Sequence, residues 1–391
     1  MNKTYIPRPK YLEMVKPFMG KGIIKVFTGQ RRVGKSCIMA QIADTIKHDV
    51  VYIDKEKYEF ESIKNNIDLT KYVLNKTRGK KTSLFIDEVQ EIEGFEKSIR
   101  DFAKSGQYDI YISSSSDLAG KLSGRYVEIR VHALSYEEFL VFHKLEKGMA
   151  SLEKYIKYGG LPYLVNLELN DEQVYGYLKN VFDAVILKDV VSRFEVRNVN
   201  FLERLIEYLA DNLGSIVSAK KISDFLESQN IKLSPNTVLN YLSFLQSSFF
   251  VAKAQRMDIK GKKIFEIGEK YYFEDLGLRH VIVNFKQVDI NKILENLVYS
   301  RLLDLGYKVF VGQTDNGEID FVGEKAGDKI YVQVSYLISS SKVEKREFGS
   351  LMDIKDNYKK IVVTMDDMAG GNVKGITHMH ILDFLVGNFG H

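Results

Sequence analysis

The 391-residue chain contains a single cysteine, Cys37. One cysteine excludes an intramolecular disulfide framework and a cysteine-rich zinc site. The sequence also lacks an uncharged apolar run of about 18 residues, the length that spans a bilayer, and its first 22 residues lack the apolar core of a secretory signal. Its net charge of +4 is too small to indicate nucleic-acid binding by itself. We therefore expect a cytoplasmic protein without a membrane partner.

Short apolar runs alternate with helical patterns over residues 1–140. The strand-like runs are residues 22–29, 49–56, 82–89, 108–116 and 125–134. Strands that alternate with helices predict an α/β domain with a mostly parallel sheet, covered on both faces. Residues 141–200 are expected to be a helical linker or lid, interrupted by the Gly/Pro break in "YIKYGGLPYL".

Two further regions follow. Residues 201–285 show helical patterns at 201–214, 218–229 and 234–249, and then two strand-like runs hinged at Gly261. The third pattern begins with Ser234 as N-cap and Pro235 at the first helical position. This order predicts a winged-helix-like domain. Residues 286–391 begin with a helix and continue with strands, which predicts a second α/β domain.

The stretch "GQRRVGKS" fits the phosphate-binding pattern G-x-x-x-x-G-K-[ST] between a strand and a helix. Its glycines allow a tight loop whose N–H groups bind phosphate, Lys35 would neutralise the β- and γ-phosphates, and Ser36 would ligate Mg²⁺. The pattern therefore predicts ATP or ADP and Mg²⁺ as ligands. The arginines of the loop are expected to point outward. The nucleotide-binding candidates are Gly29, Gln30, Arg31, Arg32, Val33, Gly34, Lys35, Ser36 and Cys37.

Catalytic candidates follow the next strands. In "SLFIDEVQ", Asp87 would hold the Mg²⁺ shell and Glu88 would orient the attacking water, which favours hydrolysis over binding alone. In "YISSSS", Ser113 is placed to contact the γ-phosphate, with Ser114 as its rival. Arg125 precedes the last strand, where a guanidinium could stabilise the transferring phosphoryl group of a neighbouring subunit. A homo-oligomer would then complete the site.

The ordered series "GQRRVGKS", "LFIDEVQ", "SGRYVEI", "LSYEEF", "YGGLP" and "KYYFEDLGLR" resembles bacterial and archaeal AAA-type ATPases with a C-terminal domain of unknown function. The resemblance covers almost the whole chain. It implies an AAA+ P-loop core, a winged-helix-like middle and a C-terminal domain similar to PD-(D/E)XK nucleases. The serines at 113–115 depart from the Thr-Gly-Ser that is common in the family.

The C-terminal domain matches the nuclease pattern only in part. Glu295 could be the helix acid and Asp320 the strand aspartate. Gln333 stands where the second acid of the pattern is expected, and Ser335 stands where the lysine is expected. Because a nuclease needs two acids for Mg²⁺ and a lysine for the attacking water, the sequence favours an inactive, nuclease-like domain over a working Mg²⁺-dependent nuclease.

The partner on which ATP hydrolysis would act stays open between duplex DNA and an unidentified protein. The third helical pattern of the middle region has no arginine to read bases, so contact with DNA would be non-specific. A basic stretch that could follow phosphates surrounds Gly261, with Asp258 as its acid. Its cations are Lys253, Arg256, Lys260, Lys262 and Lys263. A nucleotide-driven switch or motor on DNA and an ATP-controlled protein-binding switch are both consistent with these residues.

Overall fold

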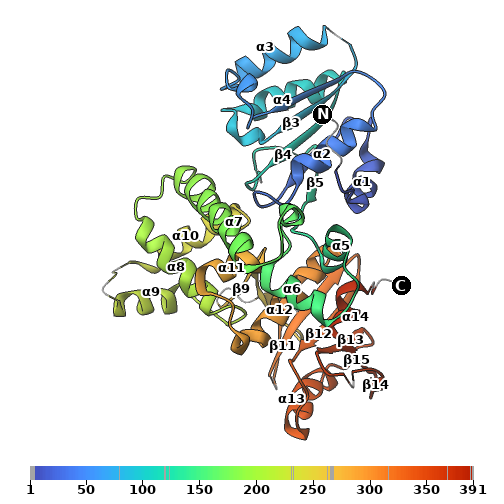
Figure 1. Ribbon diagram of the computed structural model, residues 1–391, viewed down its shortest axis with the longest axis vertical. Coiled ribbons are helices and arrows are strands. Elements are labelled where there is room, and N and C mark those ends of the chain that lie inside the picture. Colours follow the sequence, from blue (N-terminus) through green and yellow to red (C-terminus); the bar gives the residue numbers. More distant parts are fainter. Residues whose placement is uncertain are drawn as a thin grey trace. The chain divides into compact units, whose positions relative to one another are not determined.

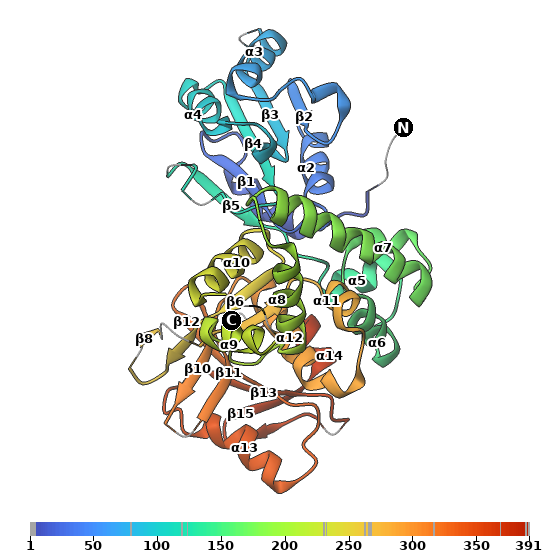
Figure 2. The same cartoon turned by 90° about the vertical axis from the view of Figure 1, so that its left-hand side faces the viewer.

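The computed structural model describes residues 5–78, 80–118, 120–122, 124–229, 231, 233–261, 263–264, 268–315, 317–367, 369–387 and 389. They divide into two compact units, each described separately below (Figures 1 and 2). Unit 1 comprises Met1–Ala133 with Ser247–Phe249, and unit 2 comprises Leu134–Gln246 with Phe250–His391. Within the described ranges, no helix is both long and apolar enough to cross a membrane.

Unit 1 is a parallel sheet flanked by helices. Its strands are β1 (Ile24–Thr28), β2 (Val50–Asp54), β3 (Thr82–Asp87), β4 (Tyr108–Ser114) and β5 (Tyr126–Arg130). Its helices are α1 (Pro9–Val15), α2 (Lys35–Asp44), α3 (Asn66–Thr77) and α4 (Phe95–Ser105). The strand order is β2-β3-β4-β1-β5, and every neighbouring pair is parallel. The predicted parallel α/β sheet is confirmed, with all five strands close to their expected positions.

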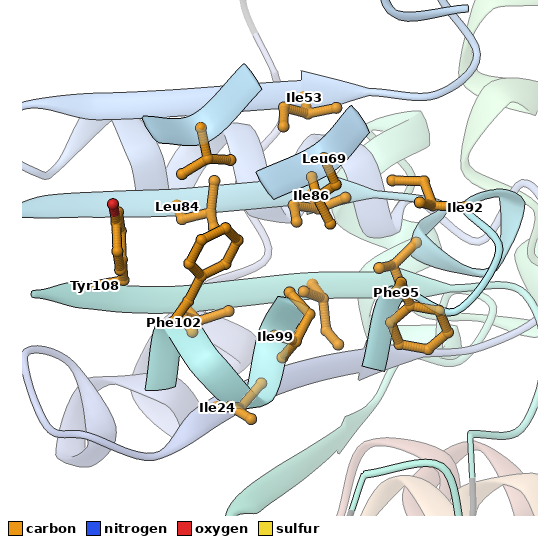
Figure 3. Packing of buried hydrophobic residues seen from close by; sticks show 14 of the residues in the cluster. Ile24, Ile53, Leu69, Leu84, Ile86, Ile92, Phe95, Ile99, Phe102 and Tyr108 are labelled. Atoms are coloured by element: carbon orange, nitrogen blue, oxygen red, sulfur yellow. The ribbon is translucent and has the colours of Figure 1, made fainter. Parts of the chain in front are cut away.

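The core of unit 1 fills the space between one face of the sheet and helices α3 and α4 (Figure 3). Leu84 and Ile86 of β3 face this layer because side chains alternate along a strand. Ile99 and Phe102 of α4, one turn apart, pack onto them from the helix side. This packing fixes the carboxyl ends of β1, β3 and β4, from which the polar loops emerge.

Unit 2 contains a helical part and a large mixed sheet. Its helices are α5 (Tyr136–His143), α6 (Met149–Tyr158), α7 (Asp171–Ala184), α8 (Val199–Asp211), α9 (Ala219–Ser228), α10 (Pro235–Ser247), α11 (Leu276–Val283), α12 (Ile290–Asp304), α13 (Ser341–Met352) and α14 (Ile381–Val386). The last residue of α10 falls in unit 1. A π-helical segment, Val185–Ser192, continues α7. The strands are β6 (Val251–Ala254), β7 (Arg256–Asp258), β8 (Lys263–Ile264), β9 (Lys270–Phe273), β10 (Lys308–Thr314), β11 (Gly317–Lys325), β12 (Asp328–Val334), β13 (Lys359–Thr364), β14 (Asn372–Val373) and β15 (Ile376–His380).

The two strand-like runs around Gly261 do not form one independent hairpin. Strands β6 and β9 pair with each other, whereas β7 and β8 form the end of an eight-stranded sheet with the order β14-β15-β13-β12-β11-β10-β7-β8. Strand β7 runs parallel to β10, and the N–H of Val311 donates to the carbonyl of Gln255 at 2.9 Å. Strands β7 and β8 of the expected wing are therefore part of the C-terminal sheet. The winged-helix assignment of this region stays a prediction.

Two of the quoted motifs, "YGGLP" and "KYYFEDLGLR", meet in unit 2. Asp275 caps α11 through the N–H of Leu278 at 3.0 Å and also accepts the N–H of Gly160 at 2.7 Å. Gly159 has a φ of +78°, and a Cβ there would lie 2.4 Å from an Asp275 carboxylate oxygen. Burial raises the pKa of Asp275 to about 6, against the hydrogen bonds from backbone N–H groups. These motifs therefore join the end of α6 to the start of α11.

Candidate ATP site

The phosphate-binding loop connects β1 to α2, as expected for its motif. Gly29 and Gly34 have φ values of +155° and +97°, which side chains disfavour. A Cβ on Gly29 would lie only 2.2 Å from the carbonyl oxygen of Val131. The loop follows this tight path because these positions are glycine, and its end coincides with the N-terminus of α2, where phosphate groups bind readily.

Lys35, the first residue of α2, is folded back onto the loop. Its ammonium donates to the carbonyls of Gly29 at 2.9 Å and Gln30 at 3.0 Å, and it lies 3.4 Å from a carboxylate oxygen of Glu88. Only 3% of this residue is exposed. The structure thus brings together the predicted phosphate-binding lysine and the predicted water-orienting acid.

Asp87 ends β3 and is almost fully buried. Ser113, on the adjacent strand β4, donates to its carboxylate and accepts the backbone N–H of Glu88 at 2.9 Å. Burial raises the pKa of Asp87 to about 6, and the charge of Glu88 adds to this effect, against hydrogen bonds from Ser113 and Ser36. The two predicted metal ligands, Ser36 and Asp87, therefore lie side by side.

Glu88 has a left-handed backbone conformation with a φ of +54°, so the chain turns sharply after β3. Its carboxylate accepts the side-chain amide of Gln90 and the backbone N–H of Ser115 at 3.3 Å. Burial alone would raise the pKa of Glu88, but the charges of Lys35 and Arg31 outweigh it and lower the pKa to about 2. Adjacent carboxyl groups thus have opposite shifts, and Glu88 is ionised at neutral pH.

The serines after β4 have different partners. Ser113 contacts the carboxylate of Asp87 and the backbone N–H of Glu88, whereas the hydroxyl of Ser114 donates to the carbonyl of Ser116 at 2.7 Å. Ser115 reaches Glu88 through its backbone and accepts the Gln90 amide at 3.2 Å through its hydroxyl. Sequence reasoning missed Gln90, although its position two residues after Glu88 was a usable signal.

The loop arginines differ from each other. Arg31 is 6% exposed, forms an ion pair with Glu56 from the segment after β2, and lowers the pKa of Glu88. Of the solvated or structural role expected for this arginine, the ion pair favours the structural one, because Glu56 compensates its charge within the site. Arg32 is exposed and has a φ of +72°. Only Arg32 behaves as a solvated loop residue.

Gln30 offers a test of whether the loop suits a polar ligand. Its side chain is 0% exposed, and within the described part of the chain neither its amide nitrogen nor its amide oxygen has a hydrogen-bond partner. A buried polar group without a partner costs about 1–3 kcal/mol. Together with the glycine at position 29, this orphaned amide fits a loop that is completed by a phosphate-bearing ligand. Val33 is buried and Cys37 is exposed at the first turn of α2.

Comparison with known proteins agrees with this geometry. Residues 21–140 match the family described as "AAA domain", and residues 149–289 match a domain of unknown function, DUF8612. An uncharacterised protein of Haemophilus influenzae is 34% identical over 404 residues, which cover 99% of this chain and 100% of that protein. The chain belongs to the same family as that protein. It carries an AAA-type P-loop ATPase domain. The Gly29–Ser36 loop and the acids Asp87 and Glu88 lie within the matched residues.

Other similar proteins are more distant. The uncharacterised protein MJ1544 of Methanocaldococcus jannaschii is 29% identical over 375 residues, covering 88% of this chain and 82% of that protein. Among solved structures, the Walker-type ATPase of Pyrococcus abyssi covers 70% of this chain and 94% of that chain, with a TM-score of 0.48 and 14% identity. The Aeropyrum pernix Orc1 protein, solved in complex with DNA, covers 71% of this chain and 92% of that chain, with a TM-score of 0.36 and 11% identity.

Arg125 lies at the opposite end of the AAA domain's sheet from the phosphate-binding loop. It precedes β5, whose first residue, Tyr126, is the partner of Ile24 at the start of β1, whereas the loop follows the end of β1. Five strand residues span about 16 Å, so this guanidinium does not serve the loop of its own chain. It borders a cavity of about 240 Å³. The other lining residues are Ile24, Arg100, Ala103, Lys104 and Leu122.

The three nuclease-like candidates of unit 2 come together outside the AAA domain. Glu295 of α12 and Asp320 of β11 both face the ammonium of Lys270, at 3.3 and 3.7 Å. The backbone N–H of Asp320 donates to the side-chain oxygen of Gln333 at 3.3 Å. Sequence reasoning missed Lys270, which comes from the separate two-stranded sheet of β6 and β9. It also missed a third carboxylate, Glu318, although this residue lies two positions before Asp320 on β11.

Three of the five candidate DNA-binding cations are engaged with other side chains. Their partners are Glu269 for Lys253 at 3.5 Å, Gln313 for Arg256 at 2.7 Å and Asp315 for Lys260. Lys262 lies outside the described residues, and Lys263 is placed only as part of β8. Two of these cations are therefore paired with acids, which reduces the positive field that they present to a phosphate backbone.

Proposed function

We propose that the chain binds ATP with Mg²⁺ and hydrolyses it to ADP and phosphate. The observation that carries this proposal is the convergence of four groups from three elements: Lys35 on α2, Asp87 and Glu88 at the end of β3, and Ser113 on β4. A site that only bound nucleotide would not require a second acid with an ionised side chain beside the phosphate-binding lysine.

Each residue has a role that follows from its position. The ammonium of Lys35 would leave the loop carbonyls and donate its hydrogen bonds to phosphate oxygens instead. Ser36 and Asp87 would hold Mg²⁺, which neutralises charge on the phosphates when bound. Glu88 accepts a hydrogen bond from the attacking water and directs its lone pair. Ser113 fixes both acids. The Gln30 amide gains the polar partners that it lacks within the described residues.

Replacing Lys35 tests the binding site. We expect Lys35→Ala to weaken ATP binding by about 10- to 100-fold, since charge-assisted hydrogen bonds contribute about 1.5–3 kcal/mol. Calorimetric titration with ATP and Mg²⁺ measures the change. Lys47→Ala, which removes an exposed lysine just after α2, is the matched control and should bind like the wild type. Equal affinity in Lys35→Ala and the wild type would place the nucleotide elsewhere.

The acid pair predicts a pH dependence. Because the pKa of Asp87 is raised to about 6, this carboxyl is ionised above pH 6 and gains a proton as the pH falls through that value. Protons then compete with Mg²⁺, so Mg²⁺-dependent ATP binding should weaken by up to about tenfold per pH unit below pH 6. Titrations of ATP binding between pH 5 and 8 test this. In Asp87→Asn, the Mg²⁺-dependent affinity for ATP should no longer fall with pH. An unchanged slope in Asp87→Asn would assign the titration to another group.

We further infer that residues 201–285 form a winged-helix-like domain and residues 286–391 a nuclease-like domain without nuclease activity. The nuclease-like fold is supported by the order of its elements, which are α12, the antiparallel strands β10, β11 and β12, helix α13 and the parallel strand β13. Gln333 and Ser335 occupy the positions of the missing acid and lysine.

Arg125 would act on the nucleotide of a neighbouring copy in a homo-oligomer.

We propose that hydrolysis drives a switch or motor, with duplex DNA as the first candidate partner and a protein as the alternative. A DNA partner predicts an ATPase rate that rises at least about twofold with duplex DNA at low salt and returns to the basal rate as salt increases. The double variant Lys253→Ala/Lys260→Ala should lose most of this response. If DNA has no effect at low salt, the protein alternative is favoured, and it predicts ATP-dependent co-purification of one partner.

A further inference from the structure

Three carboxylates and one ammonium form a partly buried cluster in unit 2, which we call the Lys270 cluster. The carboxylates belong to Glu295 on α12 and to Glu318 and Asp320 on β11. The ammonium of Lys270 on β9 lies 3.3 Å from Glu295, 2.7 Å from Glu318 and 3.7 Å from Asp320. The side chain of Lys270 is only 4% exposed. The lysine thus reaches all three acids from a strand outside the nuclease-like segment.

Two further hydrogen bonds hold acids of the cluster. The hydroxyl of Tyr272 donates to Glu295 at 3.2 Å, and the backbone N–H of Val334 donates to Asp320 at 2.8 Å. A Cβ on Gly214 would lie 2.8 Å from a carboxylate oxygen of Glu295, so the wall is close-fitting on that side. The acids therefore converge on a confined volume, and the ammonium of Lys270 lies in it.

The electrostatics show what this ammonium does. Burial alone would lower the pKa of Lys270, but the charges of Glu295, Asp320 and Glu318 outweigh it and raise the pKa above its ordinary value. Burial raises the pKa of Asp320, and the charge of Glu295 adds to that rise. Buried carboxylates need a positive partner, and here it is a lysine.

We propose that the ammonium of Lys270 occupies the position that a divalent cation would take among Glu295, Glu318 and Asp320, and so keeps this site free of metal. Carboxylate oxygens are ligands for Mg²⁺ and Mn²⁺. A tethered lysine supplies the positive charge but has no open coordination position for a water nucleophile. This inference gives the inactivity proposed for the nuclease-like domain a cause beyond the missing residues.

Mn²⁺ binding to the full-length, nucleotide-free chain tests the proposal. Lys270→Met should create one additional Mn²⁺ site, at least about tenfold tighter than any that the wild type shows in unit 2, and Mn²⁺ should raise its melting temperature. Lys270→Arg, which keeps the charge, and Lys270→Met/Asp320→Asn, which removes a ligand, should show no such gain. Electron paramagnetic resonance of free Mn²⁺ counts the sites.

A second variant, Lys270→Met/Glu318→Gln, protects the test against unfolding because it removes one negative charge together with the lysine. Glu318 is the most exposed of the three acids, with 29% of its side chain exposed, against 9% for Asp320. Its loss should therefore cost less than the loss of Asp320, and this variant should bind Mn²⁺ more tightly than the wild type but less tightly than Lys270→Met. The proposal is overturned if neither Lys270→Met nor Lys270→Met/Glu318→Gln gains an Mn²⁺ site, and failure of both to fold in the presence of Mn²⁺ counts as no gain. It is also overturned if the wild type binds Mn²⁺ at a site that Asp320→Asn abolishes. No ATP is used, so the outcome is independent of the proposed ATPase activity.

Discussion

Glu88→Gln is expected to bind ATP at least as tightly as the wild type and to hydrolyse it about 10²- to 10³-fold more slowly. The amide has the same shape and retains an oxygen for the N–H of Ser115, which now lies 3.3 Å from the carboxylate. It loses the negative charge that would polarise water. It also loses the attraction to Lys35, so the ammonium moves more easily from Glu88 to phosphate.

Single-turnover hydrolysis and ATP titration separate these effects. The matched control is Glu93→Gln, an exposed glutamate five residues further along the chain, which should turn over like the wild type. Gln90→Ala should have a smaller effect than Glu88→Gln, because it removes one hydrogen bond that orients the carboxylate and leaves the charge in place. Full turnover by Glu88→Gln would mean that another group positions the water.

The acid pair Asp87 and Glu88 could be predicted from sequence, but the opposite pKa shifts of its two carboxyl groups could not. The loop motif, the apolar run of β3 and the two acids are local features, and a parallel sheet brings the carboxyl ends of neighbouring strands to one edge. Ser113 does lie beside Asp87, while its predicted contact with the γ-phosphate stays a prediction. The pKa values depend on burial and on charges from other segments, which no local pattern contains.

Unit 2 shows the same limit for distant partners. Helix α12 and strands β10, β11, β12 and β13 lie where their apolar periodicity predicts them. Lys270, in contrast, precedes Asp320 by fifty residues and lies on β9, which pairs with β6 and not with β11, so only tertiary packing brings the ammonium to the acids. Arg31 and Glu56 are a second example in unit 1. Neither ion pair could be predicted from sequence, because each joins charges that lie far apart along the chain.

Gly159→Ala is expected to destabilise unit 2 by about 3–5 kcal/mol. A left-handed φ of +78° costs a residue with a side chain about 1–2 kcal/mol. The added methyl would also lie 2.4 and 2.5 Å from the two carboxylate oxygens of Asp275 and 2.7 Å from the backbone nitrogen of Gly277. Since Asp275 caps α11 and accepts the N–H of Gly160, moving its carboxylate would break both contacts.

Urea unfolding of the full chain, followed by circular dichroism, measures this loss as a lower midpoint for the transition of unit 2. Gly176→Ala is the matched control: Gly176 lies within α7, its Cβ would meet nothing within 4 Å, and alanine should stabilise the helix by about 0.5–1 kcal/mol. A midpoint for Gly159→Ala close to that of the wild type would show that the contact between the end of α6 and the start of α11 adjusts to the added methyl at little cost in stability. The "YGGLP" motif would then need an explanation other than packing, since its first glycine would tolerate a side chain.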